Sequence, residues 1–113
     1  MAKLITAVIK PHKLDDVKDA LRSNNVVGLT ITEAKGFGRQ GGKTETYRGS
    51  EYVVDFLPKL RIDLVVDDAD AMHLIEVIAA AARTGKIGDG KIWTTPVGDV
   101  LRIRTGERGT DAI

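Results

Sequence analysis

Two stretches of the chain repeat one order of patterns: an apolar run, an amphipathic segment and a second apolar run. In the first stretch, residues 4–9 are mostly apolar and β-branched, which is typical of a strand. Leu14, Val17 and Leu21 follow at helical spacing. Residues 29–32 then alternate between apolar and polar side chains. This half of the chain is therefore predicted to form a strand, a helix and a strand.

The second stretch carries the same order and adds one element. Residues 60–66 alternate as a strand does, and Asp67 and Asp68 can cap a following helix. The predicted apolar face of this helix consists of Met72, Ile75, Ala79 and Ala82. Residues 91–95 predict another strand, broken at Pro96. Alternation over residues 100–104 predicts a terminal strand, so Arg102 and Arg104 are expected on one strand face.

Two such units combine most simply into an α+β ferredoxin-like βαββαβ sandwich, with both helices on one face of an antiparallel sheet. The 113 residues are enough for one domain, over residues 1–113. The first strand is apolar on both faces, and two helices can cover only one of them. We therefore expect the other face to meet another copy of the chain, as a homo-oligomer.

Residues 36–59 interrupt the pattern between the two units. Five of the chain's twelve glycines lie in residues 36–49, and neither strand nor helix spacing is sustained. A loop of this length inside a small domain is usually functional or disordered. We expect a long, mobile binding arm.

Composition excludes several classes of protein. A net charge of +1 argues against a dedicated nucleic-acid binder. Without cysteine, the chain has no disulfide framework, thiolate nucleophile or cysteine metal site. No apolar run reaches membrane-spanning length, and the first residues lack a secretory signal, so a cytoplasmic protein is expected. The two histidines, His12 and His73, are interpreted as surface or partly packed residues.

Two glycine motifs resemble nucleotide fingerprints but lack their context. Residues 36–41 spell G-x-G-x-x-G, yet no helix is predicted to begin there to hold a pyrophosphate. Residues 85–91 spell G-x-x-x-x-G-K, but Ile92 stands where a P-loop has Ser or Thr. The segment also leads from a helix to a strand, the reverse of a P-loop. Neither motif by itself predicts a nucleotide fold.

The same glycines can still expose backbone N–H groups to an anion. Lys86, Lys91, Arg102 and Arg104 add positive charge. Two arginines on one strand face could clamp a polyphosphate, or they could be solvated residues of an edge strand. From these residues alone, we infer an oligomeric, anion-binding domain with a long arm.

Two longer segments are far more specific. Residues 47–52 (Tyr-Arg-Gly-Ser-Glu-Tyr) and 84–93 (Thr-Gly-Lys-Ile-Gly-Asp-Gly-Lys-Ile-Trp) resemble the two signatures of the PII nitrogen-regulatory signal transduction proteins. Residues 36–40, 54–59 and 102–107 also match that family. The resemblance implies a non-catalytic homotrimer with a nucleotide site in each cleft between subunits. ATP and ADP would compete there, and 2-oxoglutarate would bind together with Mg-ATP.

The resemblance also implies which residues form the nucleotide site. Carried over by position, they are Val8, Thr30, Gly36, Gly38, Arg39, Gln40, Asp63, Val65, Gly88, Asp89, Gly90, Lys91, Arg102 and Arg104. Thr30, Asp63 and Val65 would meet the base, against the apolar wall of Val8. The glycine turn and the arginines would meet the phosphates. Asp63 stands where the family usually has Glu, so its contact to the base is one methylene shorter.

The 2-oxoglutarate site implied by the resemblance adjoins the phosphates. Its residues are Gly38, Arg39, Gln40, Gly41, Gly42 and Lys59. Gln40 would complete the coordination of Mg²⁺, and Lys59 would pair with a carboxylate of the acid. Mg²⁺ and Lys59 together would offset the repulsion between a triphosphate and a dicarboxylate.

Residues 36–59 correspond to the T-loop, with which the family docks on an ammonium transporter, glutamine synthetase adenylyltransferase or other nitrogen-metabolism targets. Membrane recruitment would occur only through such a transporter. Tyr52 matches a tyrosine that a nucleotidyltransferase uridylylates or adenylylates, and Ser50 matches a phosphorylated position. His12, Gly41 and Lys43 depart from the common residues. A phosphoryl-transfer enzyme and a purely structural oligomer are the alternatives.

Overall fold

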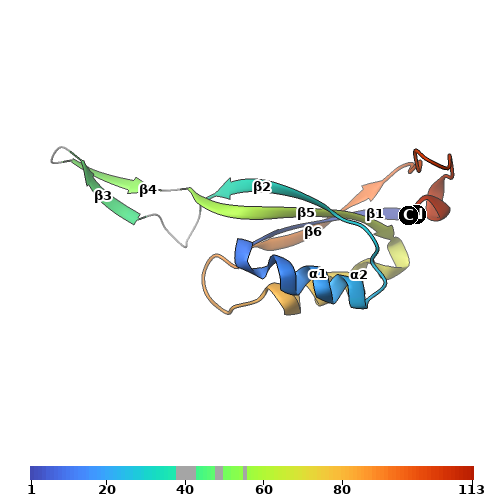
Figure 1. Ribbon diagram of the computed structural model, residues 1–113, viewed down its shortest axis with the longest axis horizontal. Coiled ribbons are helices and arrows are strands. Elements are labelled where there is room, and N and C mark those ends of the chain that lie inside the picture. The colour runs from blue at the N-terminus through green and yellow to red at the C-terminus, as the bar shows by residue number, and fades with distance from the viewer. Residues whose placement is uncertain (38–42, 48–49, 55) are drawn as a thin grey trace.

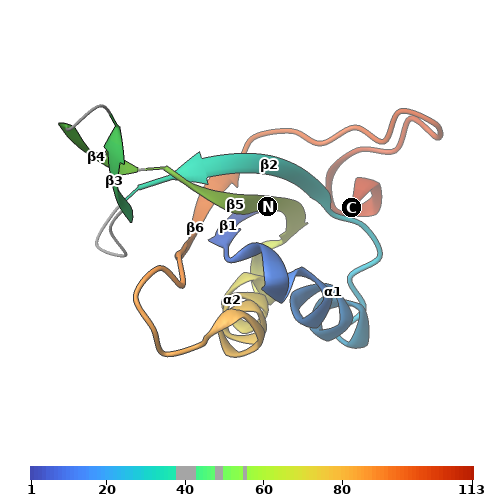
Figure 2. The same ribbon diagram turned by 60° about the vertical axis from the view of Figure 1, so that its left-hand side comes forward.

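Four strands form one antiparallel sheet, and two helices cover one of its faces. The computed structural model describes residues 1–37, 43–47, 50–54 and 56–113. The strands of the sheet are β1 (Ala2–Ile9), β2 (Thr30–Gly36), β5 (Leu57–Asp67) and β6 (Lys91–Val97). Their order across the sheet is β2-β5-β1-β6, so the two units interleave. The helices α1 (Leu14–Ser23) and α2 (Asp68–Ala82) lie side by side below the sheet (Figures 1 and 2). The predicted ferredoxin-like sandwich is confirmed.

The N-terminal ends of the two helices differ, because α2 has a side-chain cap and α1 has none. Asp15 and Asp16 lie in the first turn of α1, where the helix dipole favours carboxylates. The Asp67 side chain accepts a hydrogen bond from the Ala69 N–H (3.4 Å) and so caps α2. A short 3₁₀ helix, η1 (Pro11–Lys13), leads from β1 into α1, and another, η2 (Gly109–Ala112), lies near the C-terminus.

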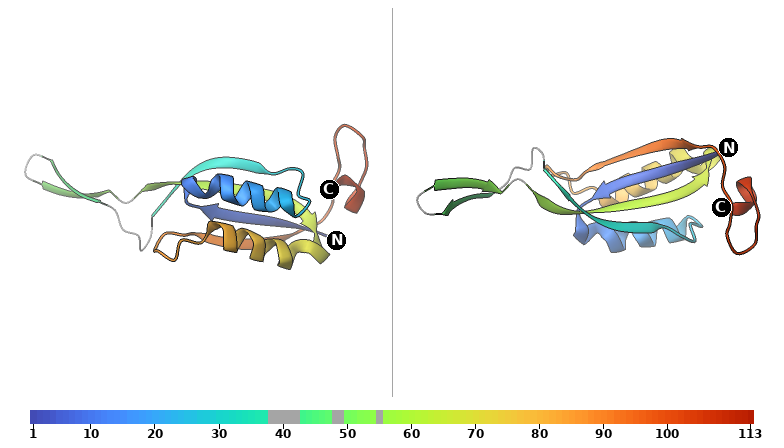
Figure 3. Two further views of the ribbon diagram at one scale, coloured as in Figure 1. Left: turned by 60° about the horizontal axis from the view of Figure 1, so that its bottom comes forward. Right: turned by 90° about the horizontal axis from the view of Figure 1, so that it is seen from above.

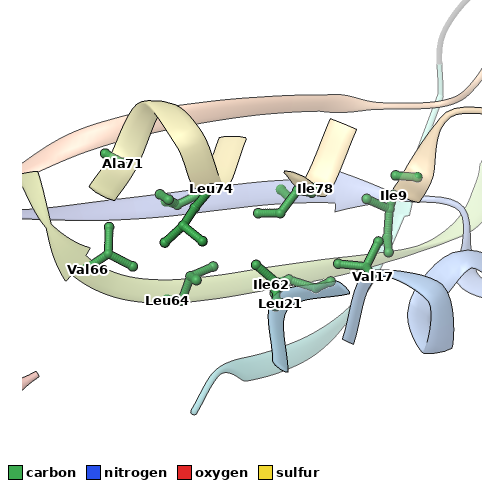
Figure 4. Close-up of a cluster of buried hydrophobic side chains, with 12 residues drawn as sticks. Ile9, Val17, Leu21, Ile62, Leu64, Val66, Ala71, Leu74 and Ile78 are labelled. Carbon is green, nitrogen blue, oxygen red and sulfur yellow. The ribbon is translucent and has the colours of Figure 1, made fainter. Parts of the chain in front are cut away.

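The hydrophobic core lies between the helices and the sheet (Figure 4). Every second residue of β1 and β5 points toward the helices, as the period of two requires. The buried cluster consists of Ile5, Ala7, Ile9, Val17, Leu21, Ile62, Leu64, Val66, Ala71, Leu74, Ile78 and Ala82. The predicted apolar face of α2 was wrong at Met72, which is 73% exposed. The residue of this turn that faces the core is Ala71, which begins the buried row of α2 that continues through Leu74, Ile78 and Ala82.

The opposite face of the sheet carries no helix among the described residues, and its side chains form ordered rows. Strand pairing aligns Thr30, Asp63, Thr6 and Trp93 across all four strands. The next row toward the end of β1 holds Thr32, Arg61, Val8 and Lys91. Figure 3 shows this face uncovered.

The predicted boundaries of the arm differ from the structure. The sequence placed the arm at residues 36–59, but β2 includes Gly36 and β5 already begins at Leu57. Between them, β3 (Lys43–Tyr47) and β4 (Ser50–Val54) form a hairpin beyond the end of the sheet (Figure 1). Pro58 is accommodated in β5 because β1 ends at the Ile9–Leu60 pair, leaving only β2 alongside.

Another predicted boundary is at Pro96, which was expected to break its strand. Instead β6 continues to Val97. As the edge strand of the sheet, β6 can include a residue without an N–H, because only one of its sides is paired.

The predicted terminal strand over residues 100–104 was wrong. Only a single bridge joins Leu101 to Arg108, and the chain turns in between, with the Gly106 N–H donating to the Arg102 carbonyl (2.8 Å). Alternation there reflects a hairpin-like turn without a neighbouring strand to extend it. The expectation that Arg102 and Arg104 share a strand face falls with it.

Candidate functional site

The connection between α2 and β6 folds into a turn over residues 84–91, at the end of the sheet from which the β3–β4 hairpin extends (Figures 1 and 3). Gly85, Gly88 and Gly90 have φ of 82°, 96° and 98°, conformations that side chains disfavour. A Cβ added to Gly90 would lie 1.7 Å from the Val8 carbonyl oxygen. Glycine is therefore required where this turn crosses the end of β1.

A cleft of about 810 Å³ adjoins this turn. Its lining consists of Val8, Gly36, Phe37, Lys59, Lys86, Ile87, Gly88, Asp89, Gly90, Lys91 and Trp93. Val8 and Lys91 are direct cross-strand partners, which explains how β1 and β6 supply one wall. The predicted residues Gly88–Lys91 thus meet Gly36, Val8 and Lys59 at one cleft.

Lys59 enters the cleft from β5 and is only 8% exposed. Its Nζ donates to the Gly88 carbonyl at 2.6 Å, and its stem passes Gly36, where an added Cβ would lie 3.5 Å from Lys59 Cγ. Burial lowers the pKa of Lys59, with repulsion from Lys10 acting in the same direction and the Asp89 carboxylate opposing both. An anion beside this ammonium group would be strongly favoured.

Asp89 lies in the turn, but its carboxylate points to protein donors. It accepts from the backbone N–H groups of Thr84 and Gly85, both at 2.9 Å, and from the Thr84 hydroxyl. Lys10 Nζ lies 3.4 Å from the same carboxylate. The Thr84 hydroxyl is the largest cause that holds the pKa of Asp89 well below its usual range. Such a carboxylate is a poor general base.

Lys10 and Thr84 were not among the predicted site residues. Lys10 is separated from Thr84 by 74 positions, and its Nζ donates to the Thr84 hydroxyl at 3.1 Å. No local pattern predicts this contact, because it depends on β1 ending beside the turn. Thr84 is the first residue of the second signature segment, and this was the only sequence feature that pointed to it.

Other predicted nucleotide residues lie outside this cleft. Thr30 and Asp63 pair directly across β2 and β5 on the uncovered face. The Asp63 carboxylate accepts from the Thr6 hydroxyl (2.7 Å) and from Arg61 Nε (3.0 Å). Val65 lines a separate cavity of about 440 Å³, near Thr110 and Ile113.

The C-terminal segment, which carries Arg102 and Arg104, lies at the opposite end of the sheet from the turn (Figure 1). Arg102 donates to Glu107 Oε1 (3.2 Å) and to the Ile113 carbonyl oxygen (3.0 Å). Arg104 is exposed. Within one chain, these side chains do not meet the glycine turn.

Several predictions fall on residues that the structure does not describe in full. Gly38, Arg39, Gln40, Gly41 and Gly42 lie outside the described residues. Ser50 and Tyr52 belong to β4, whose backbone alone is described.

The histidines agree with their interpretation as surface residues. Both are exposed, and His73 Nε2 lies 2.9 Å from Asn24 Oδ1. Trp93 is 42% exposed and lines the cleft. Within the described ranges, no three His, Cys, Asp or Glu side chains gather as a metal site, and no helix is long and apolar enough to span a membrane.

The fold and the cleft define a small α+β protein with a preformed cationic, glycine-lined site. Residues 2–107 match the family model of nitrogen regulatory protein P-II. The chain is 62% identical to the nitrogen regulatory protein P-II of Azospirillum brasilense, over 98% of this chain and 99% of that one. It is 61% identical to that of Rhodospirillum rubrum, with the same coverage.

A solved structure agrees with this relationship. The crystal structure of Arabidopsis thaliana PII bound to citrate superposes with a TM-score of 0.82 and 34% identity, covering 99% of this chain and 92% of that one. The chain belongs to the nitrogen regulatory protein P-II family, whose members are signalling regulators of nitrogen metabolism rather than enzymes.

Proposed function

We propose that this P-II protein binds ATP or ADP, and 2-oxoglutarate together with Mg-ATP, in a cleft completed between the subunits of a homotrimer. Residues 36–59 would report the bound ligands to targets of nitrogen metabolism, such as an ammonium transporter or glutamine synthetase adenylyltransferase. The observation that carries the proposal is the glycine turn. Its one acidic side chain, Asp89, is paired with protein donors and with Lys10, while Lys86 and Lys91 line the cleft.

The division of the predicted residues supports a site shared between subunits. Val8, Gly36 and the glycine turn line one cleft, whereas Thr30, Asp63 and Val65 do not reach it. Val65 pairs with Leu4, four positions before Val8, which corresponds to about 13 Å along a strand. A second copy of the chain would bring these residues to the cleft of its neighbour, so that one nucleotide would contact both groups.

The uncovered face of the sheet offers a surface for such a copy. Leu4 and Val8 are half-buried there, and Val65 and Trp93 are 36% and 42% exposed. Apolar residues on an open sheet face favour burial against a partner. Arg102 and Arg104 would then be supplied to the cleft of a neighbouring subunit.

Lys59 supports a carboxylate ligand beside the nucleotide. Its ammonium group is buried and has one hydrogen-bond partner among the described residues, the neutral Gly88 carbonyl. A ligand carboxylate would compensate this charge far better than a carbonyl does. The Arabidopsis relative was solved with citrate, a tricarboxylate, which is compatible with such a ligand. Mg²⁺ would be held mainly by phosphate and ligand oxygens, with Gln40 as the protein donor.

Calorimetric titration of 2-oxoglutarate tests the proposal in parallel with Mg-ATP, with Mg-ADP and without nucleotide. Binding is expected only beside Mg-ATP. The Lys59→Met variant is expected to retain ATP binding and to lose 2-oxoglutarate. Lys35→Met, an exposed lysine on β2, is the matched control. If ATP binds but 2-oxoglutarate does not bind under any condition, the 2-oxoglutarate part of the proposal is wrong and the protein senses only ATP and ADP.

A mixing experiment tests the shared site. Lys91→Ala and Arg102→Ala each remove one side of the proposed cleft. Trimers reassembled from both variants are expected to regain some high-affinity ATP sites, because one of their interfaces combines intact sides. Absence of any recovery, with mixed trimers demonstrated, would contradict a site between subunits.

Covalent modification is proposed at Tyr52, and less directly at Ser50. Mass spectrometry of the protein from nitrogen-starved and nitrogen-rich cells would detect a nucleotidyl group on Tyr52, with Tyr52→Phe as the control.

A further inference from the structure

The turn over residues 84–91 places an aspartate in the middle of a cleft that is proposed to hold a polyphosphate. Asp89 lies between Gly88 and Gly90, and the cleft reaches all three residues. A free carboxylate here would repel phosphate groups. Phosphate binding at this turn therefore requires that the negative charge of Asp89 be compensated by the protein.

Backbone N–H and hydroxyl donors at the start of the turn compensate part of the Asp89 charge. One Asp89 oxygen accepts from the Thr84 and Gly85 N–H groups, and the other accepts from the Thr84 hydroxyl. The Thr84 oxygen in turn accepts from the Lys86 N–H at 3.1 Å. Asp89 thus holds the N–H groups of Thr84 and Gly85, and the Thr84 hydroxyl oxygen holds that of Lys86.

Lys10 supplies the compensating positive charge. It follows the last residue of β1, and its Nζ lies 3.4 Å from Asp89 Oδ1 and 3.1 Å from the Thr84 hydroxyl. The side chains of Lys10 and Asp89 are 19% and 25% exposed, so water screens this pair less than a surface pair. The same end of β1 passes Gly90 at Val8. The turn is thereby joined to the sheet by a charge as well as by backbone packing.

We propose that Lys10 is a positioning residue for the nucleotide site: with Thr84 and Asp89 it holds the glycine turn in shape and cancels the Asp89 charge, so that a nucleoside polyphosphate meets no uncompensated carboxylate there. The proposal rests on the proposed nucleotide binding. It assigns Asp89 to the protein side of the site, as an organiser of the turn rather than as a direct ligand. Lys59, on the other side of the turn, holds Gly88 and remains available to a carboxylate.

The Lys10→Met variant tests this role against Lys13→Met. Lys13 lies three residues away, and its ion pair is with Asp16 on α1 (3.5 Å), so both variants remove one charge from the same region. Lys10→Met is expected to weaken ATP about 10-fold or more, and ADP less, because ATP carries the larger negative charge. Lys10→Arg is expected to restore most of the affinity. Lys13→Met is expected to bind as the wild type does.

A double-mutant cycle separates charge compensation from a general loss of structure. In an Asp89→Asn background there is no charge to cancel, so Lys10→Met should cost much less ATP affinity than it does in the wild type. Equal losses in both backgrounds, equal losses for ATP and ADP, or no rescue by Lys10→Arg would overturn the charge-cancelling role.

Amide hydrogen exchange without nucleotide tests the turn by itself. The N–H groups of Thr84, Gly85 and Lys86 are expected to exchange slowly in the wild type and in Lys13→Met, and at least 10-fold faster in Lys10→Met and Asp89→Asn. If the wild type binds no ATP while this acceleration is seen, the proposed function and the polyphosphate role fail but the organisation of the turn by Lys10 stands. Unchanged exchange in Lys10→Met would overturn the inference whatever the nucleotide affinity.

Discussion

The glycine turn over residues 84–91 and the C-terminal segment over residues 98–113 both combine glycines with basic residues, yet they are held in different ways. Side chains from distant parts of the chain secure the turn: Lys10 reaches Asp89, and Lys59 reaches Gly88. Contacts within the C-terminal segment are exposed and local, such as Arg102 with Glu107. Exposed pairs of this kind stabilise a protein little. The turn is thus held by contacts across the fold, whereas the hydrogen bonds of Arg102 to Glu107 and Ile113 stay within its own segment.

The largest expected effect comes from Gly90→Ala, which attacks the close approach of the turn to β1. The new Cβ would lie 1.7 Å from the Val8 carbonyl oxygen, at a φ of 98°. We expect the free energy of unfolding to fall by about 3 kcal/mol, measured by urea denaturation. Gly98→Ala in the C-terminal segment, with nothing within 4 Å of its Cβ, should change it by about 0.5 kcal/mol or less. Equal stability of the two variants would remove the distinction between the regions.

Arg102→Ala tests the other side of the comparison. If its guanidinium meets phosphate across a subunit boundary, ATP binding should weaken by about 1.5–3 kcal/mol. Stability should change by about 1 kcal/mol at most, because the Arg102–Glu107 pair is exposed. Calorimetry and urea denaturation together measure this split. Unchanged ATP affinity would exclude Arg102 from the site.

Acid stability sharpens the description of the turn. Hydrogen bonds from Thr84 depress the folded-state pKa of Asp89, so its stabilising contribution is present above the unfolded-state pKa of about 3.9. That contribution is lost as the pH falls below about 4 toward the folded-state pKa. Asp89→Asn is expected to reduce the slope of unfolding free energy against pH in this range, followed by circular dichroism. Asp15→Asn, which changes an exposed carboxylate on α1, is the control. The same slope in both variants would argue against the network around Asp89.

The smallest effect is expected for Arg108→Gln, which removes the exposed pair with Asp99 in the C-terminal segment. Stability should fall by about 0.5 kcal/mol or less, and less still at high salt. ATP affinity should match that of the wild type, which makes this variant the control for Arg102→Ala. A loss of several-fold in ATP affinity would mean that the whole segment, rather than Arg102, serves the site.

Local sequence patterns predicted most of the secondary structure, but they failed where strand formation depends on pairing with a neighbouring strand. The spacing of Leu14, Val17 and Leu21 was sufficient for α1, because a helix satisfies its backbone within itself. Alternation over residues 100–104 was not sufficient for a strand, because a strand needs a neighbour and none lies beside it among the described residues. At Pro96 the sequence predicted a strand break that the structure does not have. Proline is tolerated there because β6 is an edge strand.

The sequence by itself determined the class of fold, the glycine turn and the family, through two long motifs and a repeated strand–helix–strand order. Only the tertiary structure decided what the polar residues do. Lys10 and Asp89 lie 79 positions apart, and they meet because β1 ends where the turn crosses it. Electrostatic contacts across that separation leave no periodic pattern, since each depends on the path of the whole chain. For the same reason, segments that the motifs group together can lie apart: the glycine turn before β6 and the C-terminal segment lie at opposite ends of the sheet (Figure 1).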